Sequence, residues 1–589
     1  MNRIIWIITV GALNFLMAAA PALAQPSEDD QLNTFFKSYL EDYFRQQPLA
    51  ATQLGDHRFD HQLDDISPEA RAAWLALAEK TLQELPQKVD YHRLSRDGQI
   101  DFEIIQHNLQ MQIWETENFH PFREDPRTYG AYLNDSVYLL LTQSTLPKET
   151  NVANCLARMA QMPRIVAEAE KTLTHPAKPI LETAIRQNQG AIDFYKKDIF
   201  LLAGDTAQAD QLKASAASVA GLLENYQKFL EGPLMARASG EWRIGQRRFD
   251  QKFELETDAG ITAEQNLADA ETEFDHVRRD MYVLARQLWC QYFPRTPLPP
   301  DDAAGERDTI LRVIDAIDRD HSTPEGLVTD ARADIERIKD FIRKRDYIRL
   351  PDPDRCEVIV MPEFRRGNSL AYLDNAPPLD PNAHSYYAIS PPPSDWTPQQ
   401  VESFLEEYNR YMLQILTIHE GYPGHYVQLA EAVRVPSLIR RVYQSGTYIE
   451  GWAVYGEMTM LNEGYGDGDL RLRMMELKFY LRAVANSILD YKMHCTQMTD
   501  AEAMKFLTQD AFQSEGEAKL KLIRAKQSSV QLSTYFVGRM AHYRLHQEIE
   551  RELGDKFDLA RYHNAVIAHG SVPVKYLPEL VRADLGLAK

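Results

Sequence analysis

Cysteine is scarce in this sequence. Four occur in 589 residues: Cys155, Cys290, Cys356 and Cys495. None belongs to a C-x-x-C pair, which argues against a thiolate zinc site and a thioredoxin-like redox motif. An even number permits disulfides in an exported protein, but the wide spacing indicates no pairing. We therefore expect buried free thiols or one structural bridge.

Basic charge and long apolar runs are also in short supply. The chain has 65 Lys and Arg residues against 86 Asp and Glu residues, a net charge of −21. Nucleic acids and anionic membrane surfaces are bound by basic patches, so we expect neither partner. Beyond the N-terminus no stretch approaches the roughly 20 apolar residues of a membrane span. We therefore expect no membrane insertion of the mature chain.

The N-terminus has the pattern of a secretory signal peptide. Arg3 supplies a positive charge, and an apolar run follows from Ile4 to Met17. Small residues at Ala22 and Ala24 form a cleavage pattern. We expect cleavage after Ala24, so that residues 1–24 are removed and the protein is periplasmic or secreted. No Cys follows the small residues, so a lipid anchor is not expected.

Most of the chain shows helical periodicity. Between about residues 30 and 290, apolar residues recur at helical spacing. The segments 68–83, 99–115, 150–172 and 207–230 are examples. Residues 350–398 hold ten of the 31 prolines, and long helices are not expected there. Two short strands are expected instead, at Cys356–Met361 and Ser385–Ser390. The fold class is therefore mainly α with a small β-sheet.

Domain organisation is less constrained. A proline-rich segment at 293–300 suggests an N-terminal helical part, 25–300, followed by a part that carries the site, 301–589. One continuous domain, 25–589, is the alternative.

A helical run that begins near Pro398 leads into the residues with the strongest chemical pattern. Thr397 and Gln400 form a capping box around the first turn. The apolar face of this run continues into His419, which is followed directly by Glu420. Burying such groups is costly unless they are paired or bound to a metal ion, so this pattern indicates a site.

The spacing of the two histidines departs from the H-E-x-x-H helix of zinc proteases. His425 follows His419 by six residues rather than four. On a regular helix six residues turn about 600°, which would leave His425 roughly 120° from His419. Pro423 and Gly424 lie between them, and they predict a break or bulge in the helix. Such a break can bring His425 back toward His419.

Several motifs resemble a bacterial family known as domain of unknown function number eight hundred and eighty-five. The pattern His-Glu-Gly-x-Pro-Gly-His-x-x-Gln, from His419 to Gln428, is similar to its signature. The segments 48–57, 450–457, 533–538 and 570–573 resemble further family motifs. The resemblance implies a gluzincin-like zinc metallopeptidase with a large helical fold, like that of thimet oligopeptidase or carboxypeptidase Taq. It implies no particular substrate.

A third metal ligand is expected in the next helical segment. A catalytic zinc ion takes three protein ligands and leaves one position open, and His, His and Glu form a known set. Glu457 follows Glu450 by seven residues, about 10.5 Å along a helix, so both cannot bind one ion. We expect Glu450 as the ligand, because it matches the family position. Glu457 is then expected to orient a ligand histidine.

The expected chemistry is hydrolysis by a metal-activated water. Glu420 is the candidate general base. Tyr535 and His569 are candidate hydrogen-bond donors to the reaction intermediate, and Arg539 is a candidate binder of a substrate carboxylate. The strand at 385–390 is expected to offer its edge to an extended peptide.

The function expected from the sequence is a zinc-dependent hydrolase, foremost a peptidase acting on short peptides, with one Zn²⁺ per chain. A zinc amidohydrolase or esterase for a non-peptide substrate is the first alternative, because the metal-water chemistry is shared. A non-catalytic binding protein on a peptidase scaffold is the second, although Glu420 is retained. The sequence does not decide between exo- and endo-cleavage, and it leaves the oligomeric state open.

Overall fold

A computed structural model describes residues 27–361, 371–380, 382–392 and 396–587. The signal peptide expected at 1–24 lies outside the described residues. Helices dominate the described chain, which confirms the mainly α fold class. No helix of the described residues is long and apolar enough to cross a membrane.

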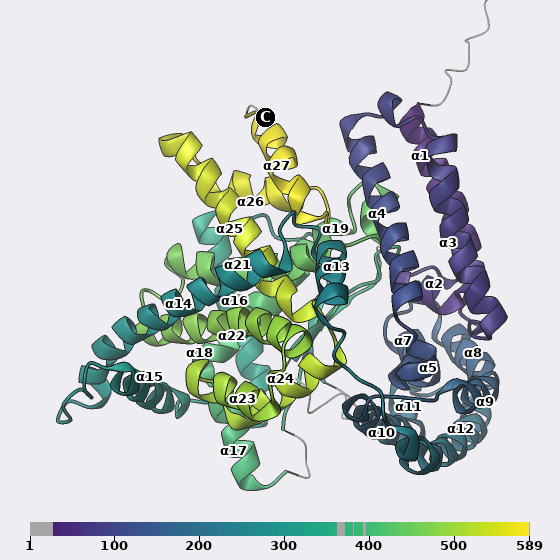
Figure 1. Ribbon diagram of the computed structural model, residues 1–589, viewed down its shortest axis with the longest axis horizontal. Coiled ribbons are helices and arrows are strands. Elements are labelled where there is room, and N and C mark those ends of the chain that lie inside the picture. The colour runs from purple at the N-terminus through teal and green to yellow at the C-terminus, as the bar shows by residue number, and fades with distance from the viewer. Residues whose placement is uncertain (1–26, 362–370, 381, 393–395, 588–589) are drawn as a thin grey trace, which may run out of the picture.

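The first twelve helices form one side of the molecule, coloured purple to blue in Figure 1. Ser27 and Ser95 cap α1 and α4 through their side chains, which accept hydrogen bonds from backbone N–H groups of the first turn. The bounds are α1 Glu28–Gln46, α2 Pro48–Leu54, α3 Pro68–Lys88, α4 Arg96–Asn118, α5 Pro121–Glu124, α6 Arg127–Gly130, α7 Ser136–Thr142, α8 Lys148–Met159, α9 Met162–Thr172, α10 Lys178–Asp193, α11 Ile199–Ala203 and α12 Ala209–Phe229.

The remaining helices form the other side, coloured teal to yellow in Figure 1. The proline-rich segment near residue 300 lies between two of them, α14 and α15. The first bounds on this side are α13 Gln246–Thr257, α14 Ala263–Tyr292, α15 Ala303–Asp318, α16 Leu327–Arg345, α17 Pro398–Glu407, α18 Arg410–Glu420, α19 His425–Ala432 and α20 Leu438–Val442. The last are α21 Gly446–Asn462, α22 Leu470–Cys495, α23 Asp500–Lys505, α24 Glu515–Gln527, α25 Thr534–Leu553, α26 Leu559–Ile567 and α27 Leu577–Leu585.

The main hydrophobic core draws on both parts of the chain that were expected to be separate. It contains buried residues from 32–109 as well as from 270–585. A second core is formed within residues 49–234. The main core thus joins residues from both sides of the predicted boundary at residue 300.

The small sheet has three strands in the order β1-β3-β2. Their bounds are β1 Cys356–Val360, β2 Ala371–Asp374 and β3 Ser385–Ile389. β1 and β3 pair in parallel, whereas β2 and β3 are antiparallel. The sequence predicted β1 and β3 to within a residue, but it did not predict β2. The Tyr387 hydroxyl of β3 lies 3.1 Å from the Thr417 hydroxyl, which places the sheet beside α18.

The helical run from Pro398 is two helices rather than one. α17 ends at Glu407, and Asn409 starts α18 by accepting hydrogen bonds from the N–H groups of Tyr411 and Met412. The capping box of Thr397 at the start of α17 is present as predicted. The break lets α18 take its own direction into the core.

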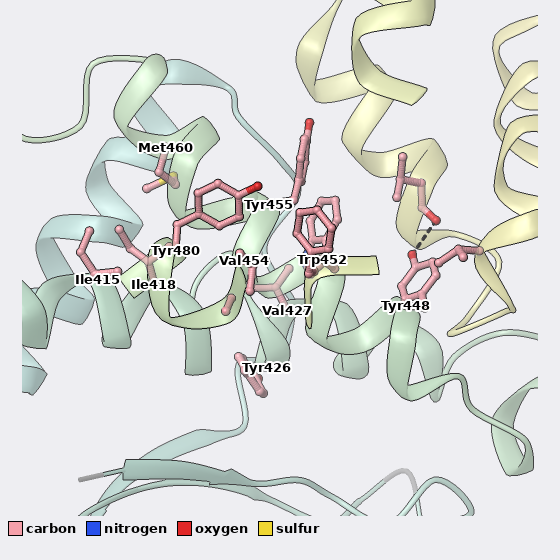
Figure 2. Packing of buried hydrophobic residues seen from close by; sticks show 14 of the residues in the cluster. Ile415, Ile418, Tyr426, Val427, Tyr448, Trp452, Val454, Tyr455, Met460 and Tyr480 are labelled. Carbon is pink, nitrogen blue, oxygen red and sulfur yellow. Dashed lines mark hydrogen bonds between the residues drawn. The ribbon is translucent and has the colours of Figure 1, made fainter. Parts of the chain in front are cut away.

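Helix α21 is buried along most of its length and packs against α18, α19, α22 and α25. Trp452 and Tyr455 are fully buried, and the Tyr448 hydroxyl donates to the Val566 carbonyl at 2.8 Å (Figure 2). α21 crosses α25 through two glycines. A Cβ atom on Gly451 would lie 2.2 Å from the backbone of Gly538, so side chains at this crossing are excluded. This close contact fixes the position of α21.

All four cysteines are free thiols. Cys155 is buried and Cys290 is exposed, while Cys356 and Cys495 are partly buried. The expected alternative of a structural bridge is therefore wrong for this structure.

Candidate metal centre

The chain turns sharply between the two histidines of the motif. α18 ends at Glu420, and α19 begins at His425. The Gly424 N–H donates to the Ile418 carbonyl at 3.0 Å, which folds the connecting segment back onto the end of α18. The rings of His419 and His425 lie 4.6 Å apart at an angle of 80°. The break at Pro423-Gly424 thus brings together the two histidines that a regular helix would separate.

A carboxylate from α21 completes the cluster. Glu450 Oε2 is 3.4 Å from His425 Nε2 and 3.7 Å from His419 Nε2. One ligand atom from each of the three residues lies within 4.8 Å of the others. Zinc bonds of about 2.0–2.2 Å in a tetrahedral site put neighbouring ligand atoms roughly 3.4 Å apart. The two histidines and Glu450 therefore fit a metal ion of this size.

One donor atom of the cluster also lacks a hydrogen bond within the described residues. Glu450 Oε2 is buried, and it accepts no hydrogen bond from a described residue. Such buried polar atoms are rare in native proteins unless an ion or water binds them. This observation, together with the nitrogen and oxygen donor set, favours a transition-metal ion.

Glu457 lies behind His419. Its Oε1 is 2.5 Å from His419 Nδ1, and the Glu457 side chain is fully buried. This contact keeps a proton on Nδ1 and leaves Nε2 free to bind a metal ion. The structure thus brings together the four residues expected for the metal and its support.

The electrostatics of the cluster favour a cation. Burial lowers the pKa of His419, but Glu450 and Glu457 outweigh it and raise this pKa to about 10. Burial raises the pKa of Glu457 to about 7 despite the opposing effect of His419. Burial also acts to raise the pKa of Glu450, but the two imidazoles hold it well below its ordinary value. The carboxylates of Glu420, Glu450 and Glu457 thus lie around the imidazoles of His419 and His425, and their negative charge favours a bound cation.

Replacement of Glu457 tests its support of His419. We expect Glu457→Gln to weaken zinc binding by about 10- to 100-fold, because a neutral amide is a poorer partner for the imidazole N–H. Competition with a coloured chelator measures this affinity. Glu463→Gln, at the C-terminal end of α21 beside exposed Arg345, is the control and should bind zinc like the unaltered protein. Equal affinity in both variants would contradict the supporting role of Glu457.

Glu420 is held in place by the sheet. Its Oε2 accepts a hydrogen bond from the Leu373 N–H of β2 at 2.9 Å. Burial raises the pKa of Glu420, while His425 and His419 act in the opposite direction. A carboxylate with a raised pKa beside a metal-binding cluster is suited to accept and release a proton.

The strand that lies at the site is not the one expected. β3, which includes residues 385–389, is the central strand and is paired on both sides. The prediction that it offers its edge to a peptide is therefore wrong. β2 borders the site instead, and its Leu373 N–H points to Glu420. Among the described strands β2 pairs only with β3, so its outer edge faces the cluster.

Glu450 lines a cavity of about 390 Å³. Gln531 and Thr534 also line it, and helix α4 contributes Ile104, His107, Asn108 and Met111. A larger cavity of about 970 Å³ shares the lining residues Glu115 and Lys252 with the first. A cavity lined by residues from both sides of the molecule thus reaches Glu450 of the cluster.

The other site residues predicted from the sequence do not all lie at the cluster. The Tyr535 hydroxyl accepts a hydrogen bond from Arg524 at 2.9 Å. Burial raises the pKa of Tyr535, and the charge of Glu450 raises it further, so Tyr535 lies within electrostatic reach of the cluster. His569 lies 3.0 Å from Asp584 of α27, a contact that does not join it to the cluster.

Arg539 also points elsewhere. Its guanidinium stacks on the rings of Tyr480 and Tyr543 at 4.1 and 4.5 Å, and it lies 3.6 Å from Glu273. No contact within the described part of the chain joins Arg539 to the two histidines or to Glu450. Substrate binding by Arg539 and hydrogen-bond donation by His569 thus gain no support from the structure.

Three residues near the cluster were not singled out from the sequence. Leu373 and Arg524 carry no motif signal. Ser571 lies in the C-terminal motif 570–573: its hydroxyl accepts from Gln428 of α19 at 2.9 Å, and its carbonyl accepts from the Ser445 N–H at 2.8 Å. Since Ser445 caps α21, this motif ties the helix of His425 to the helix of Glu450.

The fold and the site define a large, mainly helical protein with a buried His–His–Glu cluster. The model of the family described as "Bacterial protein of unknown function (DUF885)" matches residues 48–581, and the chain belongs to this family. None of the curated proteins matches it.

Two solved structures share the fold. A protein from Shewanella oneidensis, described as a candidate lipoprotein of unknown function, has a TM-score of 0.78 at 29% identity, over 93% of this chain and 99% of that one. A candidate lipoprotein from Colwellia psychrerythraea has a TM-score of 0.78 at 18% identity, over 95% of this chain and 99% of that one. The second likeness shows the fold alone.

Proposed function

We propose that this protein is a zinc-dependent hydrolase that cleaves peptides. The observation that carries the proposal is the juxtaposition of His419, His425 and Glu450, with Glu420 beside them and Glu457 behind them. Two imidazoles and one carboxylate form a ligand set of catalytic zinc sites, which keep a fourth position open. The cavity of about 390 Å³ at Glu450 supports a substrate of limited size.

The chemistry follows from the positions of the side chains. A zinc ion held by His419, His425 and Glu450 would supply a Lewis acid and lower the pKa of a bound water to about 7. Glu420 accepts the proton of the attacking water and passes it to the leaving nitrogen. Tyr535 has its hydroxyl hydrogen available, since the Tyr535 oxygen accepts from Arg524, and donates it to the oxyanion. The edge of β2 aligns the peptide backbone beside Glu420.

The first test is metal analysis of the purified protein. We expect about one zinc ion per chain, and its loss in His419→Ala and Glu450→Ala, because each variant removes one of three ligands. The exposed pair of Glu431 and Arg434 on and after α19 offers a control, Glu431→Ala, which should keep its zinc. A protein that takes up no metal after reconstitution with zinc would overturn the proposal.

The substrate class is tested in the same preparation. Peptides, simple amides and simple esters are compared at equal zinc content, and we expect turnover of peptides. Turnover of esters and amides without peptides would favour the amidohydrolase or esterase alternative. Zinc without any turnover would favour a binding protein.

We also propose that the protein acts in the periplasm or outside the cell. The support is the signal-peptide pattern of residues 1–24. The structural relative from Shewanella oneidensis, described as a candidate lipoprotein, agrees with a location in the cell envelope.

A further inference from the structure

Helix α24 places Arg524 behind a residue that lines the same cavity as Glu450. Arg524 Nη2 donates to Gln531 Oε1 at 2.7 Å and to the Tyr535 hydroxyl at 2.9 Å. Gln531 and Glu450 line the same cavity. The guanidinium of Arg524 therefore lies directly behind polar groups that face the proposed substrate space.

Arg524 differs from its basic neighbours in having no acidic partner. Arg482 of α22 binds Glu517 at 2.6 Å, whereas no carboxylate of the described residues lies within ion-pair distance of Arg524. The whole chain has more acidic than basic residues, so the missing acidic partner of Arg524 does not reflect a general scarcity of carboxylates. A partly buried guanidinium without a carboxylate is costly unless an anion binds it.

A second buried basic side chain, Lys521, lies one turn away on the same helix. Lys521 is only 3% exposed, and its Nζ is 3.9 Å from Glu517, the carboxylate that Arg482 already binds. Its pKa is held well below the ordinary value by burial first and then by the charge of Arg482. An anion bound nearby would favour the charged form of Lys521.

The basic groups lie close to the reacting centre. Burial lowers the pKa of Arg524, but Tyr535 and Glu450 outweigh it, which places Arg524 within electrostatic reach of the metal ligand. An anion bound by Arg524 would thus lie beside Tyr535.

We propose that Arg524, assisted by Lys521 and Gln531, binds the C-terminal carboxylate of a peptide, so that the protein is a carboxypeptidase. This inference rests on the proposed function and names its substrate class. The planar guanidinium matches a carboxylate with two parallel hydrogen bonds. Water adds its oxygen to the last peptide carbonyl and the C–N bond breaks. One proton passes through Glu420 to the leaving amine, which yields a free amino acid and a shortened peptide with a new carboxylate.

The test compares two substrates that differ only at the C-terminus: N-benzoyl-Gly-Phe with a free carboxylate, and the same compound as its C-terminal amide. With the zinc-loaded full chain we expect kcat/KM to be about 100-fold higher for the acid, the size of effect seen when a buried charge partner is lost. Arg524→Gln should lower kcat/KM for the acid by about 100-fold and leave the amide nearly unchanged. Lys519→Gln, an exposed position of α24, is the matched control and should keep the preference.

Each result has a distinct meaning. An acid-to-amide ratio near one in the unaltered protein would overturn the carboxypeptidase inference while leaving the proposed hydrolase intact. An equal loss on both substrates in Arg524→Gln, at unchanged zinc content and melting temperature, would show that Arg524 supports Tyr535 rather than the substrate, which also overturns it. Preferred cleavage of N-benzoyl-Gly-Glu amide would show that the basic groups bind an acidic side chain of the substrate rather than its C-terminal carboxylate, which also overturns the inference. Failure to cleave any of the three would overturn the proposed function as well.

Discussion

Glu420→Gln is expected to reduce kcat for peptide hydrolysis by about 10³-fold while zinc remains at about one ion per chain. A positioned general base contributes typically 10²–10⁴ to the rate, and glutamine cannot accept the proton of the attacking water. Zinc should stay because Glu420 is not one of the three clustered ligands. The amide oxygen of glutamine can still accept the hydrogen bond from Leu373, so the local structure should be kept.

The comparison needs a carboxylate from the same region that has no role in the chemistry. Glu431 of α19 pairs with Arg434 at the surface, and Glu431→Gln should keep full activity. Metal analysis and steady-state kinetics on the same samples separate loss of zinc from loss of the base. Unchanged activity in zinc-loaded Glu420→Gln would remove Glu420 from the mechanism.

The fold class could be predicted because helix signals are local. Apolar residues at helical spacing and the capping box of Thr397 depend only on neighbours in the sequence, and the capping box is present as predicted. The prediction of one continuous helix from Pro398 was wrong because Asn409 starts a new helix. Apolar spacing alone does not reveal such a cap. β2 was missed because a four-residue strand carries too little pattern to be recognised.

The metal cluster could be predicted for a different reason. His419, Glu420 and His425 lie close in sequence, so only one local break had to be inferred. Glu450 and Glu457 lie on one helix, and their seven-residue spacing predicted different positions along its axis. The structure brings His419 to both of them.

The outer groups could not be predicted, because sequence does not tell which way a long side chain turns. Arg539 follows Tyr535 by one helical turn, yet its guanidinium packs on Tyr543 in the next turn and on Tyr480 of another helix. Arg524 comes from a separate helix and meets Tyr535 only through the tertiary fold. Contacts of this kind depend on the packing of whole helices, which local patterns do not contain.

Gly424→Ala is expected to remove zinc binding and to lower kcat/KM by at least about 100-fold. A Cβ atom at this position would lie 1.9 Å from the His419 carbonyl oxygen and 2.4 Å from that of Ile418. Both obstacles are backbone atoms at the end of α18, so relief requires α18 and the start of α19 to move apart. That movement separates His419 from His425, and a displacement of about 1 Å at a catalytic site can cost roughly 10²-fold in rate.

The matched control is Gly456→Ala on α21. A Cβ atom there would meet only the Pro423 side chain, at 3.7 Å, which is an ordinary contact, and alanine favours the helix. Gly456→Ala should therefore keep zinc and activity, with an unchanged or slightly higher melting temperature. Gly424→Ala should lose about 1–3 kcal/mol of unfolding free energy through overpacking, in addition to its zinc. If Gly424→Ala binds zinc as tightly as Gly456→Ala, the close return of the chain at Gly424 is not what holds the two histidines together.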